Sequence, residues 1–181
     1  MIIRRSEICV KMIRRINDEE GIRKLVMEVF QNMWFVPLTE RRRSEKEQHL
    51  LKTKAQNITD VVVACKDTGL EWFEQLLLTL FRPKEDKDDA TKVIKEPPKV
   101  LVLACQQIVD CLMESVLKSE EKNIATLQMG AGDKTVGQRH RIVACLTTTF
   151  LFARSRPQLL VNHVQTLHPY LNVKCQTQGQ H

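Results

Sequence analysis

Apolar residues recur every three to four positions along most of the chain, which is the period of an amphipathic helix. The segment Lys11–Val26, KMIRRINDEEGIRKLV, shows the pattern best. A helix expected over roughly 2–16 ends in a basic edge, and a second one, over roughly 19–35, starts directly after Asp18. Asp18 is predicted to cap the second helix, whose positive end suits the two glutamates that follow. With almost no loop between them, the two helices are predicted to lie back to back as a hairpin.

The same period predicts five more helices and no strand. A helix near 58–66 contains the β-branched run Val61–Val63, and another begins after the turn at 67–69 and ends at Pro83. Pro97 and Pro98 open a long helix, a further one covers 138–153, and Pro157 starts the last. Residues expected on buried helix faces include Cys9, Met12, Ile13, Ile16, Ile22, Leu25, Val26, Val29, Phe30, Met33, Trp34, Ile58, Val61, Val62, Cys65, Leu70, Phe73, Leu76, Leu77, Leu80, Leu101, Ala104, Cys105, Ile108, Leu112, Val116, Ile142, Cys145, Leu146, Thr149, Phe150, Leu160, Val164, Leu167 and Leu171.

Tight turns near residues 18, 68 and 156 are separated by about one and about two lengths of a 40–47-residue repeat. This spacing predicts an all-α fold, a HEAT-type α-α superhelix (solenoid) of about three to four helix pairs, with a compact helical bundle as the alternative. We expect one HEAT-repeat segment over 1–175, cut from a longer solenoid, and a disordered tail over 176–181. Mobile charged linkers are expected near 38–56, 83–98 and 119–137, and the last of these leaves the helix pairing of the middle repeat open.

Composition narrows the class of protein. With 43% apolar and 5% aromatic residues, the chain can form a core that is mostly aliphatic. The six cysteines form no CxxC motif, and most lie on apolar helix faces, which indicates buried thiols in a reducing compartment. No charge-free apolar run could span a bilayer and no secretory signal is present, so we expect an intracellular protein without a membrane partner. The glycosylation triplet at 57–59 is therefore interpreted as a chance match.

The net charge of +6 is concentrated in basic clusters at predicted turns, and no acidic residue follows Asp133. Arginines at the turns of a solenoid emerge along an edge, where they can contact phosphates with a strong dependence on salt. No recognition helix, zinc finger or aromatic stacking platform is visible, so DNA would be contacted through its backbone. An acidic protein would use the same surface, and solvated faces with local ion pairs, such as Arg14 with Asp18, are the plain alternative. The candidate binding residues are Arg14, Arg15, Arg23, Lys24, Arg41, Arg42, Arg43, Arg154 and Arg156.

No possible catalytic or metal-binding motif in the sequence has the residues and spacing that its chemistry requires. The segment 130–135, GAGDKT, lacks a preceding strand, and its aspartate would repel a phosphate. His163 and His168 are five residues apart, so on a helix they point to different faces, and His140 and Cys145 have the same spacing. No serine or cysteine lies in a nucleophile-elbow context. We therefore expect no enzyme activity, no cofactor, no metal and no small-molecule substrate.

Three long blocks resemble one known family. CVKMIRRINDEEGIRKLV at 9–26, NITDVVVACKDTGLEWFEQLL at 57–77 and RIVACLTTTFLFARSRPQLLVNHVQTLHPYL at 141–171 are similar, ungapped and in order, to the C-terminal HEAT region of the Nipped-B-like cohesin-loading subunits. Together they hold 70 of the 181 residues. The stretches 38–56, 82–98 and 119–138 carry no such resemblance.

The resemblance implies a nuclear, chromatin-bound scaffold without an ATPase of its own. Such a loader holds double-stranded DNA against the ATPase heads of cohesin, contacts the kleisin, and stimulates ATP hydrolysis and loading for sister chromatid cohesion and gene regulation. From charge and position, the residues expected to contribute are those at the first turn and at the last tight turn. The alternative is a HEAT-type adaptor or transport solenoid that binds an acidic protein or peptide.

Overall fold

The computed structural model describes residues 5–38, 44–66, 70–82, 96–130 and 133–172, and within these ranges the chain is helical without a strand. The all-α prediction is thus confirmed, including the helical state of the run Val61–Val63. The elements, in chain order, are α1 (Arg5–Ile13), the 3-10 helix η1 (Arg14–Asn17), α2 (Glu20–Trp34), α3 (Glu45–Cys65), α4 (Glu71–Phe81), α5 (Lys99–Gln128), α6 (Asp133–Ser155), the 3-10 helix η2 (Pro157–His163) and α7 (Val164–Asn172).

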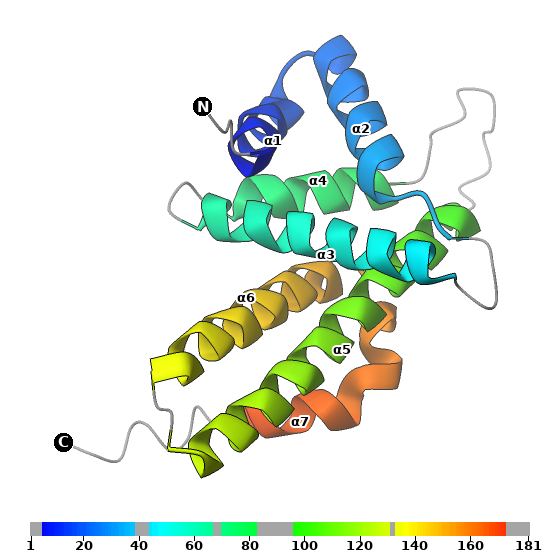
Figure 1. Cartoon of the computed structure of the whole chain (residues 1–181). Coiled ribbons are helices and arrows are strands. Elements are labelled where there is room, and N and C mark those ends of the chain that lie inside the picture. The colour runs from blue at the N-terminus through cyan, green and yellow to red at the C-terminus, as the bar shows by residue number, and fades with distance from the viewer. Residues whose placement is uncertain (1–4, 39–43, 67–69, 83–95, 131–132, 173–181) are drawn as a thin grey trace.

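The helices lie in layers that follow chain order (Figure 1). α1 and α2 form one end, α3 and α4 form the middle, and α5 and α6 pack along each other at the other end, which settles the pairing in the middle repeat. α1 contacts α3, α3 contacts α5 and α6, and η2 returns the chain onto α5. Stacked helix pairs of this kind are what a solenoid requires. The HEAT-type superhelix itself stays a prediction.

The first hairpin differs from expectation in two ways. α2 packs more on η1 than on α1, and Figure 1 shows α1 nearly end-on beside α2, so the two helices are splayed rather than back to back. Asp18 does not cap α2 either: the N-cap is Glu19, which makes no side-chain cap bond. Since Asp18 is extended and its carboxylate is paired with Arg15, it separates the two helices without capping the second.

Two of the predicted linkers are largely helical. α3 begins at Glu45 because Ser44 and Glu47 form a capping box, in which each side chain accepts a bond from the other's backbone N–H. α5 continues to Gln128. Gly130, two residues later, has a φ of 70°, the left-handed conformation that commonly follows the end of a helix. α6 starts at Asp133, before the expected position. The remaining predicted linker, near 83–98, and the predicted tail fall mostly on residues 83–95 and 173–181, which lie outside the described residues.

The centre of the core is more aromatic than composition suggested. Trp34 packs 4.6 Å from Phe30 and 6.3 Å from Phe73, measured between ring centroids. Phe152 lies 6.4 Å from both Phe35 and Phe73. These rings come from α2 and its C-cap, α4 and α6, so one cluster joins all three layers. The indole Nε1 of Trp34 donates to Oδ1 of Asn57 in α3 at 2.9 Å. The asparagine of the glycosylation triplet is thus part of a helix and hydrogen-bonded to the core.

Most predicted core positions are buried, but two helices are rotated relative to expectation. On α2 the buried residues are Val26, Phe30 and Trp34, whereas Leu25 is 62% exposed. On α6 the buried aromatic ring is Phe152, whereas Phe150 is 38% exposed. Ile22, Leu25 and Met33, which were expected inside, thus form part of the surface at the α1–α2 end.

α5 is long and apolar enough to cross a membrane by length and composition, with a window of mean hydropathy 1.7, and it alone has this property among the described residues. The window is not charge-free, because Asp110 and Glu114 lie within it. Leu101, Ile108 and Leu112 are buried against neighbouring helices. Packing in the protein core accounts for the hydropathy of this helix.

Candidate nucleic-acid and partner interface

η1 presents the first basic cluster at the turn between α1 and α2. Arg14 and Arg15 are both exposed. Arg15 Nε lies 3.1 Å from Asp18 Oδ2, while the guanidinium of Arg14 lies 4.8 Å from the ring centre of Trp72 in α4. The pair expected between Arg14 and Asp18 is therefore replaced by a cation–π contact. A ring face holds a guanidinium in place without neutralising it, so Arg14 keeps its charge and its exposed edge.

The other two residues of this cluster lie on α2 and differ in exposure. Lys24 Nζ lies 2.7 Å from Glu20 Oε1, and both side chains are 75% exposed. This lysine, through its hydrogen bond and its charge, lowers the pKa of the Glu20 carboxyl. Arg23 is half-buried, and its Nε has no hydrogen-bond partner in the part of the chain that the structure describes. Lys24 is thus available to a partner, whereas Arg23 points partly into the protein.

The last tight turn carries Arg154 and Arg156. Arg154, at the end of α6 and 69% exposed, places its Nε 3.1 Å from Oε1 of Glu74, which is 21% exposed. Arg156 is half-buried, and its Nε also lacks a partner within the described ranges. Burial raises the pKa of the nearby Cys105 thiol, and the positive charge of Arg156 acts in the opposite direction.

Both clusters contact α4. Trp72, which holds Arg14, and Glu74, which holds Arg154, are both in the first turn of that helix. The structure therefore brings cations that are 140 positions apart in sequence to one helix end. The predicted site residues with largely exposed charges are Arg14, Arg15, Lys24 and Arg154. Arg41, Arg42 and Arg43 lie outside the described residues.

A second basic surface, which the sequence analysis missed, lines a cleft of about 900 Å³ between α1, α3, α5 and α6. Five cations line it, together with two carboxylates and several hydroxyl and amide side chains. Two of the cations, Lys118 and Lys122, are one helical turn apart on α5, and Lys122 lies in the stretch 119–137 that we expected to be a linker. Because the extension of this helix beyond residue 118 was not predicted, the spacing of these lysines carried no signal. The five cations are Arg5, Lys52, Lys118, Lys122 and Arg141.

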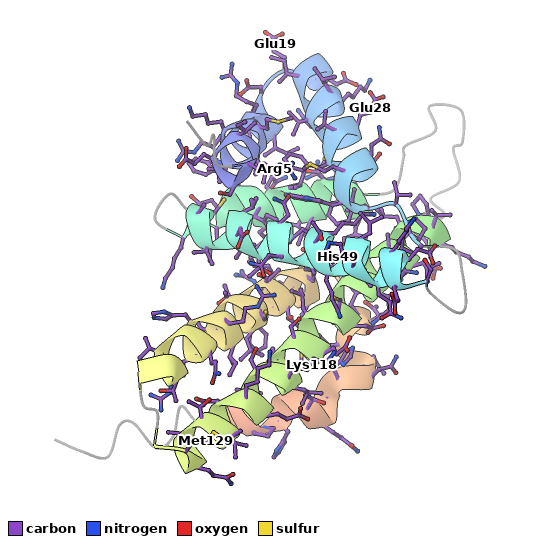
Figure 2. The ribbon with its side chains drawn as sticks, viewed as in Figure 1. Arg5, Glu19, Glu28, His49, Lys118 and Met129 are labelled. Carbon is purple, nitrogen blue, oxygen red and sulfur yellow. The ribbon has the colours of Figure 1, made fainter. Side chains whose placement is uncertain are left out.

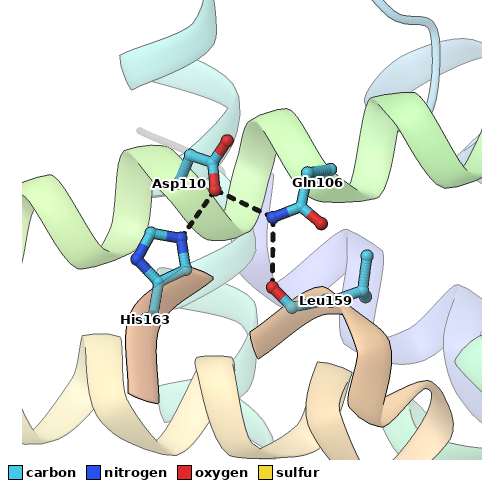
Figure 3. Close-up of polar contacts among 4 residues, drawn as sticks. All are labelled: Gln106, Asp110, Leu159 and His163. Atoms are coloured by element: carbon cyan, nitrogen blue, oxygen red, sulfur yellow. Dashed lines mark hydrogen bonds and ion pairs between the residues drawn. The ribbon is translucent and has the colours of Figure 1, made fainter. Parts of the chain in front are cut away.

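A polar junction fixes η2, and with it the turn at 154–156, against α5 (Figure 3). His163 Nε2 lies 2.6 Å from Asp110 Oδ1. Gln106 Nε2 donates both to Asp110 Oδ1 at 2.8 Å and to the Leu159 carbonyl at 3.0 Å. No carboxylate lies near His163 in the sequence, and its partner Asp110 comes from α5, 53 positions away. Among the described residues, no three groups of the metal-binding type lie together. The contact with Asp110 joins His163 in η2 to α5.

Five of the six cysteines fall within the described ranges, and all five are buried thiols, as predicted. Burial raises the pKa of the Cys105 thiol to about 12 and also raises the pKa of Cys9, Cys65 and Cys145. A thiol with a raised pKa is a weak nucleophile, because the thiolate is the reactive form. These side chains serve as small apolar core residues.

No known protein-family profile matches the chain, but several curated proteins do. It is 47% identical over 174 residues to the Nipped-B-like proteins of Homo sapiens and Mus musculus, which covers 96% of this chain and 6% of theirs. It is 40% identical over 176 residues to the Nipped-B protein of Drosophila melanogaster, covering 93% of this chain and 8% of that protein. The chain thus spans a small part of the length of these relatives. By this similarity, which confirms the resemblance seen in its motifs, the chain is a homologue of one segment of the Nipped-B-like family.

Proposed function

We propose that the chain is a scaffold segment of a cohesin loader. In this role it helps to hold DNA and cohesin together, stimulates the cohesin ATPase, and promotes loading onto chromatin for sister chromatid cohesion and gene regulation. The partners are the ATPase heads and the kleisin of cohesin and the backbone of double-stranded DNA, and the site of action is nuclear chromatin. The observation that carries the proposal is the 47% identity to Nipped-B-like proteins along 174 residues.

The basic surface at the start of α4 supports a role in holding an anionic partner. Arg15, Lys24 and Arg154 each have a carboxylate partner. The cations of these pairs are 63%, 75% and 69% exposed, and ion pairs at a surface contribute only about 0–1 kcal/mol. A phosphate can therefore replace the carboxylate at small cost, and the release of counterions from DNA favours the exchange. Arg14 needs no exchange, since Trp72 holds it without neutralising it. The scaffold itself contributes no catalytic group, and ATP hydrolysis takes place on cohesin.

The test is the DNA-stimulated ATPase activity of cohesin with the full-length loader. Arg14, Arg15, Lys24 and Arg154 are replaced together by glutamate. The control variant reverses four exposed cations outside both clusters and the cleft: Lys66, Arg82, Lys99 and Arg139. We expect the first variant to lower the stimulated rate several-fold and the control to retain it. Equal rates for the two variants, with intact helix content, would count against this surface.

An adaptor that binds an acidic protein is the second candidate function, and the basic cleft is the observation that favours it. Filter binding of duplex DNA at two salt concentrations separates the two. Binding that weakens steeply with salt supports the loader function. Salt-insensitive binding, or none, supports the adaptor.

A further inference from the structure

The cleft between α1, α3, α5 and α6 has the lining of an anion-binding groove. Its cations come from four different helices and face one space of about 900 Å³. In Figure 2, Arg5 on α1 and Lys118 on α5 lie on either side of α3, the helix that carries the lining residue Lys52. Convergence of like charges from separate elements is unfavourable unless solvent or an oppositely charged partner compensates it.

The acidic residues of the cleft are already engaged. Asp60 Oδ1 accepts a bond from Gln56 Nε2 at 2.6 Å, and Glu114 is paired with Lys118 one turn along α5. The remaining four cations form no ion pair within the described residues. They are Arg5, Lys52, Lys122 and Arg141. The cleft therefore carries unbalanced positive charge.

The neutral lining adds donors. Asn57 lines the cleft, and its Oδ1 already accepts the Trp34 indole N–H at 2.9 Å. That bond orients the amide and leaves the two N–H groups of Asn57 as its main contribution to a ligand. Both the charged and the neutral side chains thus favour an occupant with acceptor oxygens.

The shape and chemistry of the cleft select among anions. A volume of about 900 Å³ lies in the range of concave ligand pockets, about 300–1,000 Å³, and suits a short extended segment better than a broad duplex. Single-stranded nucleic acid is bound through aromatic stacking platforms, and none of the described residues that line this cleft is aromatic. Clusters of basic residues in a groove are a recurrent means of recognising acidic peptide motifs.

We propose that this cleft binds an acidic peptide segment of a partner protein, whose carboxylates pair with Lys52, Lys122 and Arg141. The site is separate from the basic surface at the start of α4, and it does not depend on DNA binding there. A chain that fails to stimulate cohesin would still bind such a peptide.

Fluorescence anisotropy tests the proposal on the whole chain, with a fluorescein-labelled peptide of alternating glutamate and serine as the probe. In the cleft variant, Lys52, Lys122 and Arg141 are replaced by glutamate. In the control variant, which has the same net charge, Lys46, Lys66 and Arg139 are replaced by glutamate; these three are exposed and outside the cleft. We expect the cleft variant to bind at least about tenfold more weakly and the control to change less than about threefold.

Two outcomes would overturn the proposal. One is an equal loss in the cleft and control variants, which would mean that the peptide responds only to net charge. The other is tighter binding of a single-stranded oligothymidine of equal charge, lost in the same cleft variant, which would assign the groove to nucleic acid. If circular dichroism shows that the glutamate variant is unfolded, the glutamine version of the same triple substitution replaces it, and the same two outcomes apply.

Discussion

The side chain of Gln107 joins the two ends of the helix stack. Its Oε1 accepts the backbone N–H of Leu38 at 2.9 Å, and its Nε2 donates to the backbone carbonyl of Leu38 at 2.9 Å. Leu38 follows α2, whereas Gln107 lies in α5, 69 positions later, and is 8% exposed. The side-chain amide thus satisfies both backbone groups of Leu38, as a neighbouring β-strand would. It holds the segment that follows α2 against α5.

Replacement by alanine removes both bonds. Each is worth about 1 kcal/mol net, and the partly buried N–H and carbonyl of Leu38 lose their partner, so we expect Gln107→Ala to lower the free energy of unfolding by about 2–3 kcal/mol. Gln107→Glu keeps the acceptor but sets a carboxylate against the Leu38 carbonyl, and we expect it to destabilise at least as much. Gln75→Ala is the control, because among the described residues the side chain of Gln75 bonds only to Thr79 Oγ1 within α4, at 3.4 Å.

Urea unfolding of the whole chain, followed by circular dichroism, measures these differences. The control should change the free energy of unfolding by less than about 0.5 kcal/mol. If Gln107→Ala changes it no more than Gln75→Ala does, the contact between Gln107 and Leu38 does not stabilise the stack, and the reasoning is refuted.

Two further predictions concern a buried thiol and the polar junction. The folded chain keeps the Cys105 proton up to about pH 12, whereas an ordinary thiol loses it near 9.0, so stability falls as pH rises above 9.0. Between about pH 8 and about pH 10 the wild type should lose on the order of 1 kcal/mol more than Cys105→Ala, and parallel pH profiles would contradict this. A double-mutant cycle of His163→Ala and Asp110→Ala should give a coupling of about 0.5–1 kcal/mol in the same unfolding assay, because Asp110 is 47% exposed and partly screened. A coupling near zero would show that the junction does not hold η2.

The helical period predicted which segments are helices but placed several boundaries wrongly. The charged, weakly amphipathic stretch 45–56 was interpreted as a linker, although the sequence Ser44-Glu45-Lys46-Glu47 carries the capping-box pattern that starts α3. The stretch 119–128 was misjudged because its apolar positions are few, yet its glutamate, lysine and alanine residues favour a helix. Local start signals were available there, and apolar periodicity alone did not use them.

The orientation of α2 could not be obtained from its sequence. Leu25 and Val26 are adjacent and both apolar, and the helix buries Val26 because the aromatic cluster around Trp34 fixes its rotation. That cluster is assembled from α2, its C-cap, α4 and α6, so its geometry depends on contacts between distant segments. Periodicity identifies an apolar face but not which part of a wide face meets the core.

The candidate site was also predicted only in part. The sequence indicates which cations lie at turns, and four of these are exposed in the structure. Their partners are not visible, since Trp72 and Glu74 reach Arg14 and Arg154 from another helix. The cleft could not be predicted from the sequence, because its lining comes from four helices that are far apart in the chain.

The dependence of DNA affinity on salt tests most directly whether the exposed cations at the start of α4 bind DNA phosphates. The dissociation constant for duplex DNA is measured over a range of salt concentrations. The variant replaces Arg14, Arg15, Lys24 and Arg154 by glutamine, and the control does so at Lys66, Arg82, Lys99 and Arg139. Each lost phosphate contact should lower the slope of log affinity against log salt by about 0.9, so we expect a slope shallower by about two to four for the variant and an unchanged slope for the control. Slopes that coincide for the wild type and the variant would contradict phosphate binding at this surface.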